Sequence, residues 1–262
     1  MKMKCPVVFF RNDENTQDEF LKAKEYFNVF EHRSKIKDSI VIGRYSVLPY
    51  YKELELDLRD CNSTLINTYS QHLYIADFQY YHTIEKHTAK SYFMKDWGDI
   101  PEHGKFVVKG YTNSRKFEWA SKMFADNKRD AINLANNLMN DFLLGSQGIV
   151  IREYLPLEIL EYGVTGMPFA NEHRFFCYKN KILASGYYWS ISEKHGKLDE
   201  NAIPFVKMIM SLVSPYVNFY VIDIARMCSG EWVVIELNDG QMSGLSEVDP
   251  AELYKNLSIA LA

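Results

Sequence analysis

The chain has 262 residues, enough to bury a large core and to form one elaborate domain or two to three subdomains that share an interface. Apolar residues make up 47% of the chain and charged residues 24%, which are ordinary values for a globular protein. The formal net charge of -4 argues against a surface built as a whole for polyanions, so no nucleic-acid partner is expected. A local basic site stays compatible with this charge.

The cysteines and the apolar runs indicate the compartment. Cys5, Cys61, Cys177 and Cys228 form no CxxC pair and have no histidine at zinc-ligand spacing, so reduced, mostly buried thiols of a cytoplasmic protein are expected. The first apolar run ends at Arg11, too short for a signal peptide or a membrane span. Since no other run approaches about 20 apolar residues, we expect a soluble protein without a membrane partner.

The first third of the chain alternates strand-like and helix-like segments without internal repeats, a rhythm that predicts an α/β layer. The predicted strands lie at residues 6–10, 39–45 and 63–67. The predicted helices lie at about residues 16–27, 50–58 and 68–82.

The pattern changes after about Thr88, where a Gly- and Pro-containing turn precedes a strand at residues 105–111. A helix is predicted from apolar residues at three- and four-residue steps, namely Ile132, Ala135, Leu138, Met139, Phe142 and Leu143. A strand at residues 147–155 then stops at Pro156. The second half is expected to contain a hairpin turning at Lys179 and Asn180, strands at 218–227 and 231–237, and helices at about 200–213 and 250–261.

The last two strands bring acidic side chains together. If Ser229 and Gly230 are the two turn residues, Asp223 lies directly opposite Glu236 in an antiparallel ladder. The two-residue period of a strand puts Asn238 on the same face as Glu236. Two carboxylates this close repel each other unless a cation lies between them, and Mg²⁺ prefers oxygen ligands of this kind. The alternative is a solvated sheet face, or pairing with a nearby Lys or Arg, and spacing alone favours neither.

A lysine at a strand end suggests a phosphate contact. Lys109 ends the apolar strand VVKG, and the polar loop after it, through Lys116, can offer backbone N–H groups to an anion. A lone lysine of this kind is more often a solvated strand end. Downstream, the strand IVIREYL ends in Glu153, Tyr154 and Leu155, where backbone groups can read the edge of a purine.

The order of these motifs resembles the ATP-grasp superfamily. Along the chain they are a strand lysine, a polar loop, a helix, the EYL strand, an ExR strand, and an Asp followed by ExN. Within the superfamily, the chain is similar to the branch related to ribosomal-protein glutamate ligases (RimK-like), including forms often carried by phages. The resemblance covers roughly residues 65–245, and Asp223, Glu236 and Asn238 are its most specific part. It implies an ATP-grasp fold of α+β subdomains at 88–155 and 156–262, preceded by an N-terminal α/β pre-ATP-grasp domain at 1–87.

The resemblance also implies residue roles in an ATP site between the two subdomains. Lys109 would contact the α- and β-phosphates, and the loop with Ser114, Arg115 and Lys116 would cover the triphosphate. The hinge at Glu153, Tyr154 and Leu155 would bind adenine through its backbone. Glu172 would hold the ribose, with Glu158 as the competing choice.

For the chemistry, the resemblance implies that Arg174 meets a phosphate or an acyl phosphate, with a surface salt bridge as its plain alternative. Asp223, Glu236 and Asn238 would bind two Mg²⁺ ions, for which Mn²⁺ can substitute. A substrate carboxylate would then attack the γ-phosphate, and an amine or a thiol would displace phosphate from the acyl phosphate. A protein or peptide is one candidate substrate. The seven histidines are dispersed and are expected to be structural or exposed.

One departure from the family pattern concerns the phosphate site. The family usually has a second phosphate lysine upstream; Lys86, Lys90 and Lys95 are available, but none has an unmistakable position, so Arg115 or Lys116 is a substitute.

Three different functions compete with a ligase. A covalent nucleotidyltransferase is disfavoured because Lys109 is not part of a KxDG motif. A nucleotide-binding scaffold without turnover and a phosphotransferase both stay compatible with the motifs. The acceptor is not specified; Tyr187, Tyr188 and Trp189 are expected to be core rather than pocket residues.

Overall fold

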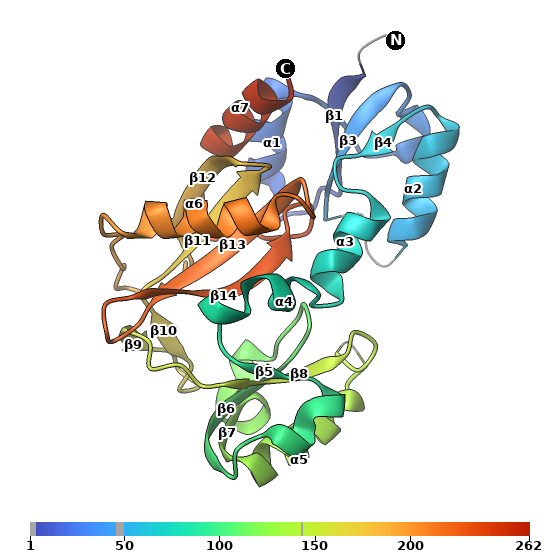
Figure 1. Ribbon diagram of the computed structural model, residues 1–262. Helices are drawn as coiled ribbons and strands as arrows, with labels where there is room; N and C mark the ends of the chain where they lie inside the picture. The colour runs from blue at the N-terminus through green and yellow to red at the C-terminus, as the bar shows by residue number, and fades with distance from the viewer. Residues whose placement is uncertain (1–3, 46–49, 143) are drawn as a thin grey trace.

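The structure is a computed structural model that describes residues 4–45, 50–142 and 144–262. Its described strands form three four-stranded sheets and one two-stranded ribbon. Figure 1 shows the central sheet below the C-terminal sheet, with the N-terminal sheet to one side of the latter. These layers match the expected mixed α/β architecture.

The N-terminal sheet is parallel, in the order β2-β1-β3-β4. Its central strand is apolar on both faces because helices cover both: Val8 and Phe10 pack in one cluster and Val7 and Phe9 in another. The strands are β1 (Cys5–Phe10), β2 (Asn28–Phe30), β3 (Ser39–Arg44) and β4 (Thr64–Leu65). The helices are α1 (Gln17–Tyr26) and α2 (Tyr51–Asp60).

The single helix expected over residues 68–82 is wrong, because two helices occupy this segment. A capping box of Thr68 and Gln71 starts α3 (Tyr69–Ala76), and α4 (Tyr80–Ile84) follows. Between them Phe78 has a φ of 59°, a left-handed conformation that interrupts a helix. The break turns Phe78 and Tyr80 into the core beneath the C-terminal sheet.

The central sheet has the order β5-β8-β6-β7 and is covered on one face by α5 (Lys128–Met139). Its strands are β5 (Ser91–Tyr92), β6 (His103–Gly110), β7 (Phe124–Asn127) and β8 (Ile149–Glu153). The helix prediction is wrong at its end, since Phe142 follows the helix and is fully exposed. The chain folds back at Gly145, whose added Cβ would lie 2.2 Å from the Met139 carbonyl oxygen. Leu143 lies outside the described residues.

The C-terminal sheet is antiparallel, in the order β12-β11-β13-β14, and α6 (Ala202–Val213) packs on one face. Its strands are β11 (Glu172–Tyr178), β12 (Lys181–Tyr187), β13 (Phe219–Arg226) and β14 (Trp232–Asp239). The hairpin expected at Lys179 and Asn180 is confirmed, with Lys179 in a left-handed conformation. The last helix, α7 (Pro250–Leu261), packs against α1 (Figure 1).

The remaining elements are short. The ribbon pairs β9 (Ile159–Tyr162) with β10 (Pro168–Ala170). The short helices are η1 (Arg33–Lys35), η2 (Glu85–His87), η3 (Met94–Asp99), η4 (Lys116–Glu118) and η5 (Trp119–Met123). Within the described part of the chain, no helix is long and apolar enough to cross a membrane. The cysteines are free thiols, but the expectation that most are buried is wrong, because Cys5 and Cys228 are exposed.

The hairpin of β13 and β14 confirms the expected pairing of Asp223 with Glu236, although by a different route. The turn has three residues rather than two: Met227 N–H donates to Glu231 O at 2.8 Å, and Gly230 takes a φ of 91°. A bulge then leaves Ile235 as an extra residue on β14 between the paired Val234 and Glu236. The extra turn residue and the bulge compensate, so the two carboxylates still face each other.

Candidate active site

The central sheet presents two cations toward the C-terminal sheet. Phe106 and Val108 of β6 pack under α5, so the alternate residues Val107 and Lys109 face the other way. Arg152 of β8 pairs with Val107 and therefore shares that face. Its guanidinium donates to Ile235 O of β14 at 2.5 Å and to Thr88 Oγ1 at 2.6 Å, which joins the two sheets.

The facing side of the C-terminal sheet carries the acidic cluster. Arg174 of β11 lies opposite Asp223 of β13 and donates to both of its carboxylate oxygens, at 2.9 and 2.7 Å. The amide nitrogen of Asn238 donates to Asp223 Oδ2 at 3.3 Å. Asp223, Glu236 and Asn238 are thus brought together on one sheet face, as the strand period predicted.

An ion pair connects the two sheets at this point. Lys109 Nζ donates to Glu236 Oε2, and both side chains are buried. Burial alone raises the pKa of the Glu236 carboxyl, but the ammonium groups of Lys109 and Lys116 outweigh it and hold that pKa well below its ordinary value. Glu236 is therefore a fixed anion between two lysines.

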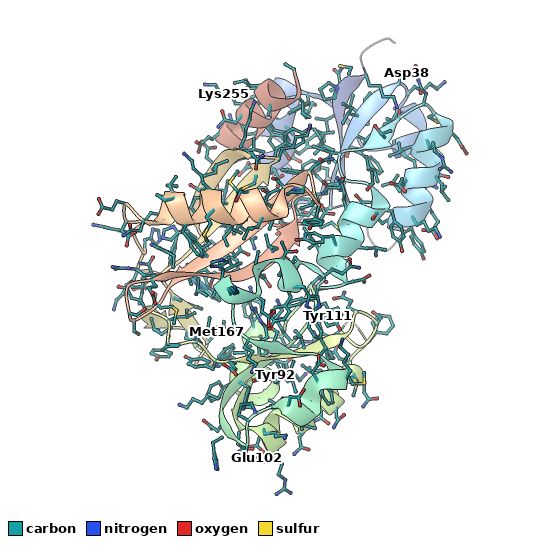
Figure 2. The ribbon with its side chains drawn as sticks, in the orientation of Figure 1. Asp38, Tyr92, Glu102, Tyr111, Met167 and Lys255 are labelled. Carbon is teal, nitrogen blue, oxygen red and sulfur yellow. The ribbon has the colours of Figure 1, made fainter. Side chains whose placement is uncertain are left out.

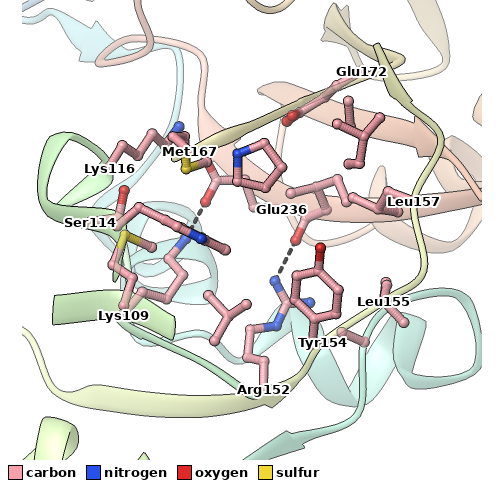
Figure 3. A pocket seen from close by; sticks show the side chains of 18 of the residues that line it. Lys109, Ser114, Lys116, Arg152, Tyr154, Leu155, Leu157, Met167, Glu172 and Glu236 are labelled. Atoms are coloured by element: carbon pink, nitrogen blue, oxygen red, sulfur yellow. Dashed lines mark hydrogen bonds and ion pairs between the residues drawn. The ribbon is translucent and has the colours of Figure 1, made fainter. Parts of the chain in front are cut away.

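A cavity of about 130 Å³ lies between the sheets at this ion pair. Figure 3 shows Lys109, Arg152 and Glu236 pointing toward one another across it, with Glu172 at its edge. Most of its wall is apolar, formed by Trp119, Met123, Leu155, Leu157, Met167 and Trp189. In Figure 2, the labels Met167 and Tyr111 mark the region between the central and the C-terminal sheet. A flat apolar ring can pack against such a wall, while the charged side chains stand at one end of the cavity.

The predicted hinge residues Glu153, Tyr154 and Leu155 all line this first cavity. The backbone N–H groups of Glu153 and Tyr154 are already bonded to Lys90 O and Lys105 O, both at 2.8 Å. Among the described residues, none accepts a hydrogen bond from the Leu155 N–H. The hinge therefore has one backbone donor available for a ligand, at Leu155.

Of the two competing acids, Glu172 lies in the first cavity and Glu158 does not. Burial raises the pKa of Glu172 to about 8, with Lys116 opposing this shift and Asp223 and Glu236 adding to it. Glu158 instead lies near Arg226, at 3.5 Å, and accepts from Asn171 at 3.1 Å. A neutral Glu172 can both donate and accept hydrogen bonds, which suits a hydroxyl-bearing ligand.

The loop after Lys109 contributes two of its three predicted residues. Ser114 and Lys116 line the first cavity, and Lys116 Nζ donates to the hydroxyl of Tyr188. Arg115 is turned away: its guanidinium makes a bidentate pair with Asp141 at 2.6 to 2.9 Å and lines neither this cavity nor the next.

A second, larger cavity of about 530 Å³ adjoins the first and shares Ser114, Lys116 and Glu236 with it. Most of the residues that line it are polar or charged, Arg174 and Asn238 among them. The guanidinium of Arg174 lies 4.7 Å from the ring centre of Tyr188, which also lines this cavity. Within the acidic cluster, Glu236 lines both cavities and Asn238 lines the second, whereas Asp223 is fully buried and lines neither.

Three residues of the site were missed from the sequence. Arg152 supplies a second cation near Glu236, whereas Lys90 is exposed beside Tyr92. Its signal was a charged residue in an apolar strand, like that of Lys109. Tyr188 and Trp189 were expected to be core residues, and Trp189 does belong to a core cluster against which Tyr188 packs. As site residues they were missed, because Trp189 also lines the first cavity and Tyr188 the second. The bend of the chain after β12 gives them these positions, and strand periodicity does not reveal it.

The donor set fits a hard divalent cation. Asp223 and Glu236 face each other, and Asn238, which donates through its nitrogen, can present its oxygen to a cation. Two carboxylates and an amide are the oxygen ligands that Mg²⁺ prefers. No cluster of three or more His, Cys, Asp or Glu side chains suited to a metal occurs among the described residues.

Known structures share the fold of this chain. D-cycloserine synthetase DcsG superposes with a TM-score of 0.61 at 11% identity, covering 98% of this chain and 99% of that one. The ATP-grasp ligase PsnB, complexed with a phosphomimetic variant of minimal precursor, Mg and ADP, gives 0.56 at 13% identity, with 100% and 98% covered. A RimK domain ATP-grasp protein from Sphaerobacter thermophilus gives 0.56 at 8% identity, with 95% and 98% covered.

These likenesses confirm the ATP-grasp fold and the expected similarity to RimK-like proteins. No curated protein sequence matches the chain. The ATP-grasp domain of R2K clade family 3 matches residues 96–257, which is more than half of the chain and includes each predicted site residue. The protein therefore belongs to the ATP-grasp family, R2K clade family 3.

Proposed function

We propose that the protein is an ATP-dependent ligase that joins a carboxylate to an amine, or to a thiol, through an acyl phosphate and releases ADP and phosphate. The observation that carries the proposal is the acidic cluster of Asp223, Glu236 and Asn238, in which Glu236 lines both the apolar and the polar cavity. The apolar cavity suits a base, the cluster suits a metal-bound phosphate chain, and the polar cavity suits the acceptor. In this proposal ATP lies between the subdomains at 88–155 and 156–262, with the domain at 1–87 beside them.

The nucleotide is bound by groups from both sheets. The Leu155 N–H and the hinge wall hold the base, and Glu172 holds the ribose. Lys109 and Lys116 bind phosphate oxygens, and Ser114 belongs to the loop that covers them. Arg152, joined to β14 through Ile235 O, adds positive charge to the same cavity. The position of Arg115 against Asp141 supports no direct phosphate contact for it.

Asp223, Glu236 and Asn238 would hold Mg²⁺, with two ions and replacement by Mn²⁺ as parts of the proposal. When bound, the metal neutralises the charge that develops on the phosphates during transfer. The structure of PsnB, which contains Mg and ADP, supports this choice through the shared fold. In this proposal Lys109 exchanges its contact with Glu236 for one with a phosphate.

The residues of this chain mainly position and neutralise the reacting groups. Arg174 lines the second cavity beside Asn238, where its guanidinium can hold the carboxylate that attacks the γ-phosphate and then the acyl phosphate. The amine or thiol attacks the acyl carbon, and phosphate leaves. A protein or peptide substrate is part of the proposal, supported at the level of fold by the precursor bound to PsnB.

The test is a turnover assay with ATP, Mg²⁺ and pools of amino acids, peptides or cell lysate, in which ADP, phosphate and mass shifts are followed together. A ligase yields stoichiometric ADP and phosphate with a condensed product. AMP attached to a lysine would indicate a nucleotidyltransferase, a phosphorylated product a phosphotransferase, and nucleotide binding without turnover a scaffold. Unchanged activity in Asp223→Asn and Glu236→Gln would contradict the site.

A further inference from the structure

The second cavity contains a histidine and an aspartate that the nucleotide site does not use. His72 of α3 and Asp239 at the end of β14 both line this cavity. The ring nitrogen Nδ1 of His72 lies 3.1 Å from Asp239 Oδ2, and both residues are almost fully buried. The two residues are far apart in sequence, and the packing of α3 against β14 brings them together.

Asp239 is held rigidly, so it fixes the histidine. Its Oδ1 accepts from the amide nitrogen of Asn67 and from the backbone N–H of Gln241, both at 3.0 Å. Gln241 also donates to the hydroxyl of Tyr51, and the Tyr51 ring stacks on His72 with a centre-to-centre distance of 4.2 Å. The carboxylate and the aromatic ring therefore determine both the position and the plane of the imidazole.

This pairing sets which nitrogen is available. A carboxylate next to Nδ1 favours the tautomer with its proton on that nitrogen, which leaves a lone pair on Nε2. Among the described residues, none bonds to His72 Nε2, and this atom is not among their buried, unpartnered polar atoms. His72 lines the second cavity, and Nε2 is the ring nitrogen that the contact with Asp239 leaves for a ligand.

A second buried histidine shows how a structural one differs. His173 packs between the rings of Tyr187 and Trp232, and its Nε2 bonds to Asn171 at 3.0 Å. Burial lowers the pKa of His173 to about 4, and it lines neither cavity. His72, by contrast, lines the second cavity and has one ring nitrogen next to a carboxylate.

We propose that His72 is the general base of the ligation step and that Asp239 is its positioning residue. This inference rests on the proposed function and names the residue that prepares the nucleophile. The nitrogen of an incoming amine gives a proton to His72 Nε2, and its electron pair forms the C–N bond to the acyl carbon. The bond from that carbon to the phosphate oxygen breaks, phosphate leaves with the bonding pair, and His72 later returns its proton to water.

The location supports this role. Asp239 directly follows Asn238 on β14, and the cavity that His72 enters also contains Glu236, Asn238 and Arg174. An acyl phosphate formed at Arg174 would therefore share one enclosed polar space with His72. Because an amine is mostly protonated at neutral pH, a base in this space accelerates its attack, typically by about 100- to 10,000-fold.

The experiment compares two nucleophiles in the proposed reaction. Wild type, His72→Gln and His82→Gln are incubated with ATP, Mg²⁺ and a pool of the standard amino acids and tryptic peptides. One arm relies on the amines of the pool, and the other adds hydroxylamine, which is largely unprotonated at neutral pH and needs no base. His82 is exposed on α4 and serves as the matched control. Amide, hydroxamate and ADP are quantified by mass spectrometry and chromatography.

We expect His72→Gln to lose amide formation by at least about tenfold while its hydroxamate formation stays within about twofold of wild type. His82→Gln should match wild type in both arms. If His72→Gln keeps full amide formation, or loses both products equally, the inference is overturned and the proposed function stands. If wild type forms neither product and releases no ADP, the proposed function fails and the inference fails with it.

A spectroscopic measurement tests the positioning residue without any substrate. Nitrogen-15 NMR of the histidine rings should assign the Nδ1–H tautomer to His72 in wild type. In Asp239→Asn the His72 signals should shift toward a mixture of tautomers, with amide formation reduced as in His72→Gln and hydroxamate formation retained. Wild-type signals for His72 in folded Asp239→Asn would contradict the positioning role.

Discussion

The two carboxylates of the acidic cluster are neutralised in different ways. Asp223 is paired with Arg174 from the adjacent strand of the same sheet, so separating the pair requires breaking that sheet. Glu236 is paired with Lys109 from the opposite sheet, so separating it requires only that the two sheets or the side chains move apart. A third carboxylate, Glu172, has no cation within salt-bridge distance among the described residues.

The Arg174–Asp223 pair is held within one sheet by the pairing of β11 with β13, whereas the Lys109–Glu236 pair spans two sheets. The Lys109–Glu236 pair joins the two sheets, and in the proposed function a metal and phosphates take its place. The following predictions break one pair at a time, from the largest expected effect to the smallest.

Removing the partner within the sheet should have the largest effect. Asp223→Ala leaves the Arg174 guanidinium buried without its carboxylate, which we expect to cost about 3–5 kcal/mol of unfolding free energy. Any turnover should also fall by about 100-fold or more. Urea unfolding and the turnover assay measure the two effects. Asp126→Asn, at an exposed position of β7, is the control. Similar stability in both variants would contradict the stabilising role of the Arg174–Asp223 pair.

Breaking the pair between the sheets should affect the ligand more than the fold. In Lys109→Met, Glu236 can turn toward the cavity water, so the loss of unfolding free energy should be about 1–3 kcal/mol. ATP affinity should fall by about tenfold or more, because a charge-assisted phosphate contact is lost. Lys105→Met, an exposed change on the same strand, should alter neither. Equal ATP affinity in both variants would contradict the role of Lys109.

The unpaired carboxylate should make stability depend on pH. Because the pKa of Glu172 is about 8 when folded and its ordinary value is 4.5, the folded state holds a proton that the unfolded state has lost over that window. Stability therefore falls as pH rises from about 5 to about 8, with a slope of about 1.4 kcal/mol per pH unit within that range. Glu172→Gln should lose less stability over this range in urea titrations. Glu158→Gln should show the same pH dependence of stability as wild type. If instead Glu158→Gln reduces the pH dependence and Glu172→Gln does not, Glu172 is not the acid responsible.

The smallest effect is expected at Arg115. Its pair with Asp141 lies outside both cavities, so Arg115→Gln should change ATP affinity by less than about threefold. Lys116→Gln should weaken ATP binding by about tenfold or more, because Lys116 lines both cavities. Titrations of ATP into the two variants decide between them. A larger effect of Arg115→Gln would mean that the loop rearranges to bring Arg115 to the phosphates.

Local patterns predicted the parts of the site that lie on regular strands. Its position at the end of an apolar strand identified Lys109, and the two-residue period of β14 placed Glu236 and Asn238 on one face. The pairing with Asp223 was predicted correctly although the turn was assigned one residue too short. The bulge at Ile235 compensated for that error, and bulges leave little signal in a single sequence.

Long-range packing supplied the parts that the sequence did not reveal. Arg152 lines the first cavity because β8 brings it to β14, and Tyr188 and Trp189 line cavities because the chain bends after β12. The approach of His72 to Asp239 depends on α3 packing against β14, which no local period encodes. The break at Phe78 overrides helical periodicity because residues on both sides of it enter one core.

Calorimetric titration of ATP, with and without Mg²⁺, into wild type and Glu236→Gln tests the central claim most directly. We predict that Mg²⁺ strengthens ATP binding to wild type by about tenfold or more, through the carboxylates of the cluster. Glu236→Gln should keep its binding of metal-free ATP and lose this enhancement. An equal enhancement by Mg²⁺ in both proteins, or no binding of ATP by wild type, would contradict the account.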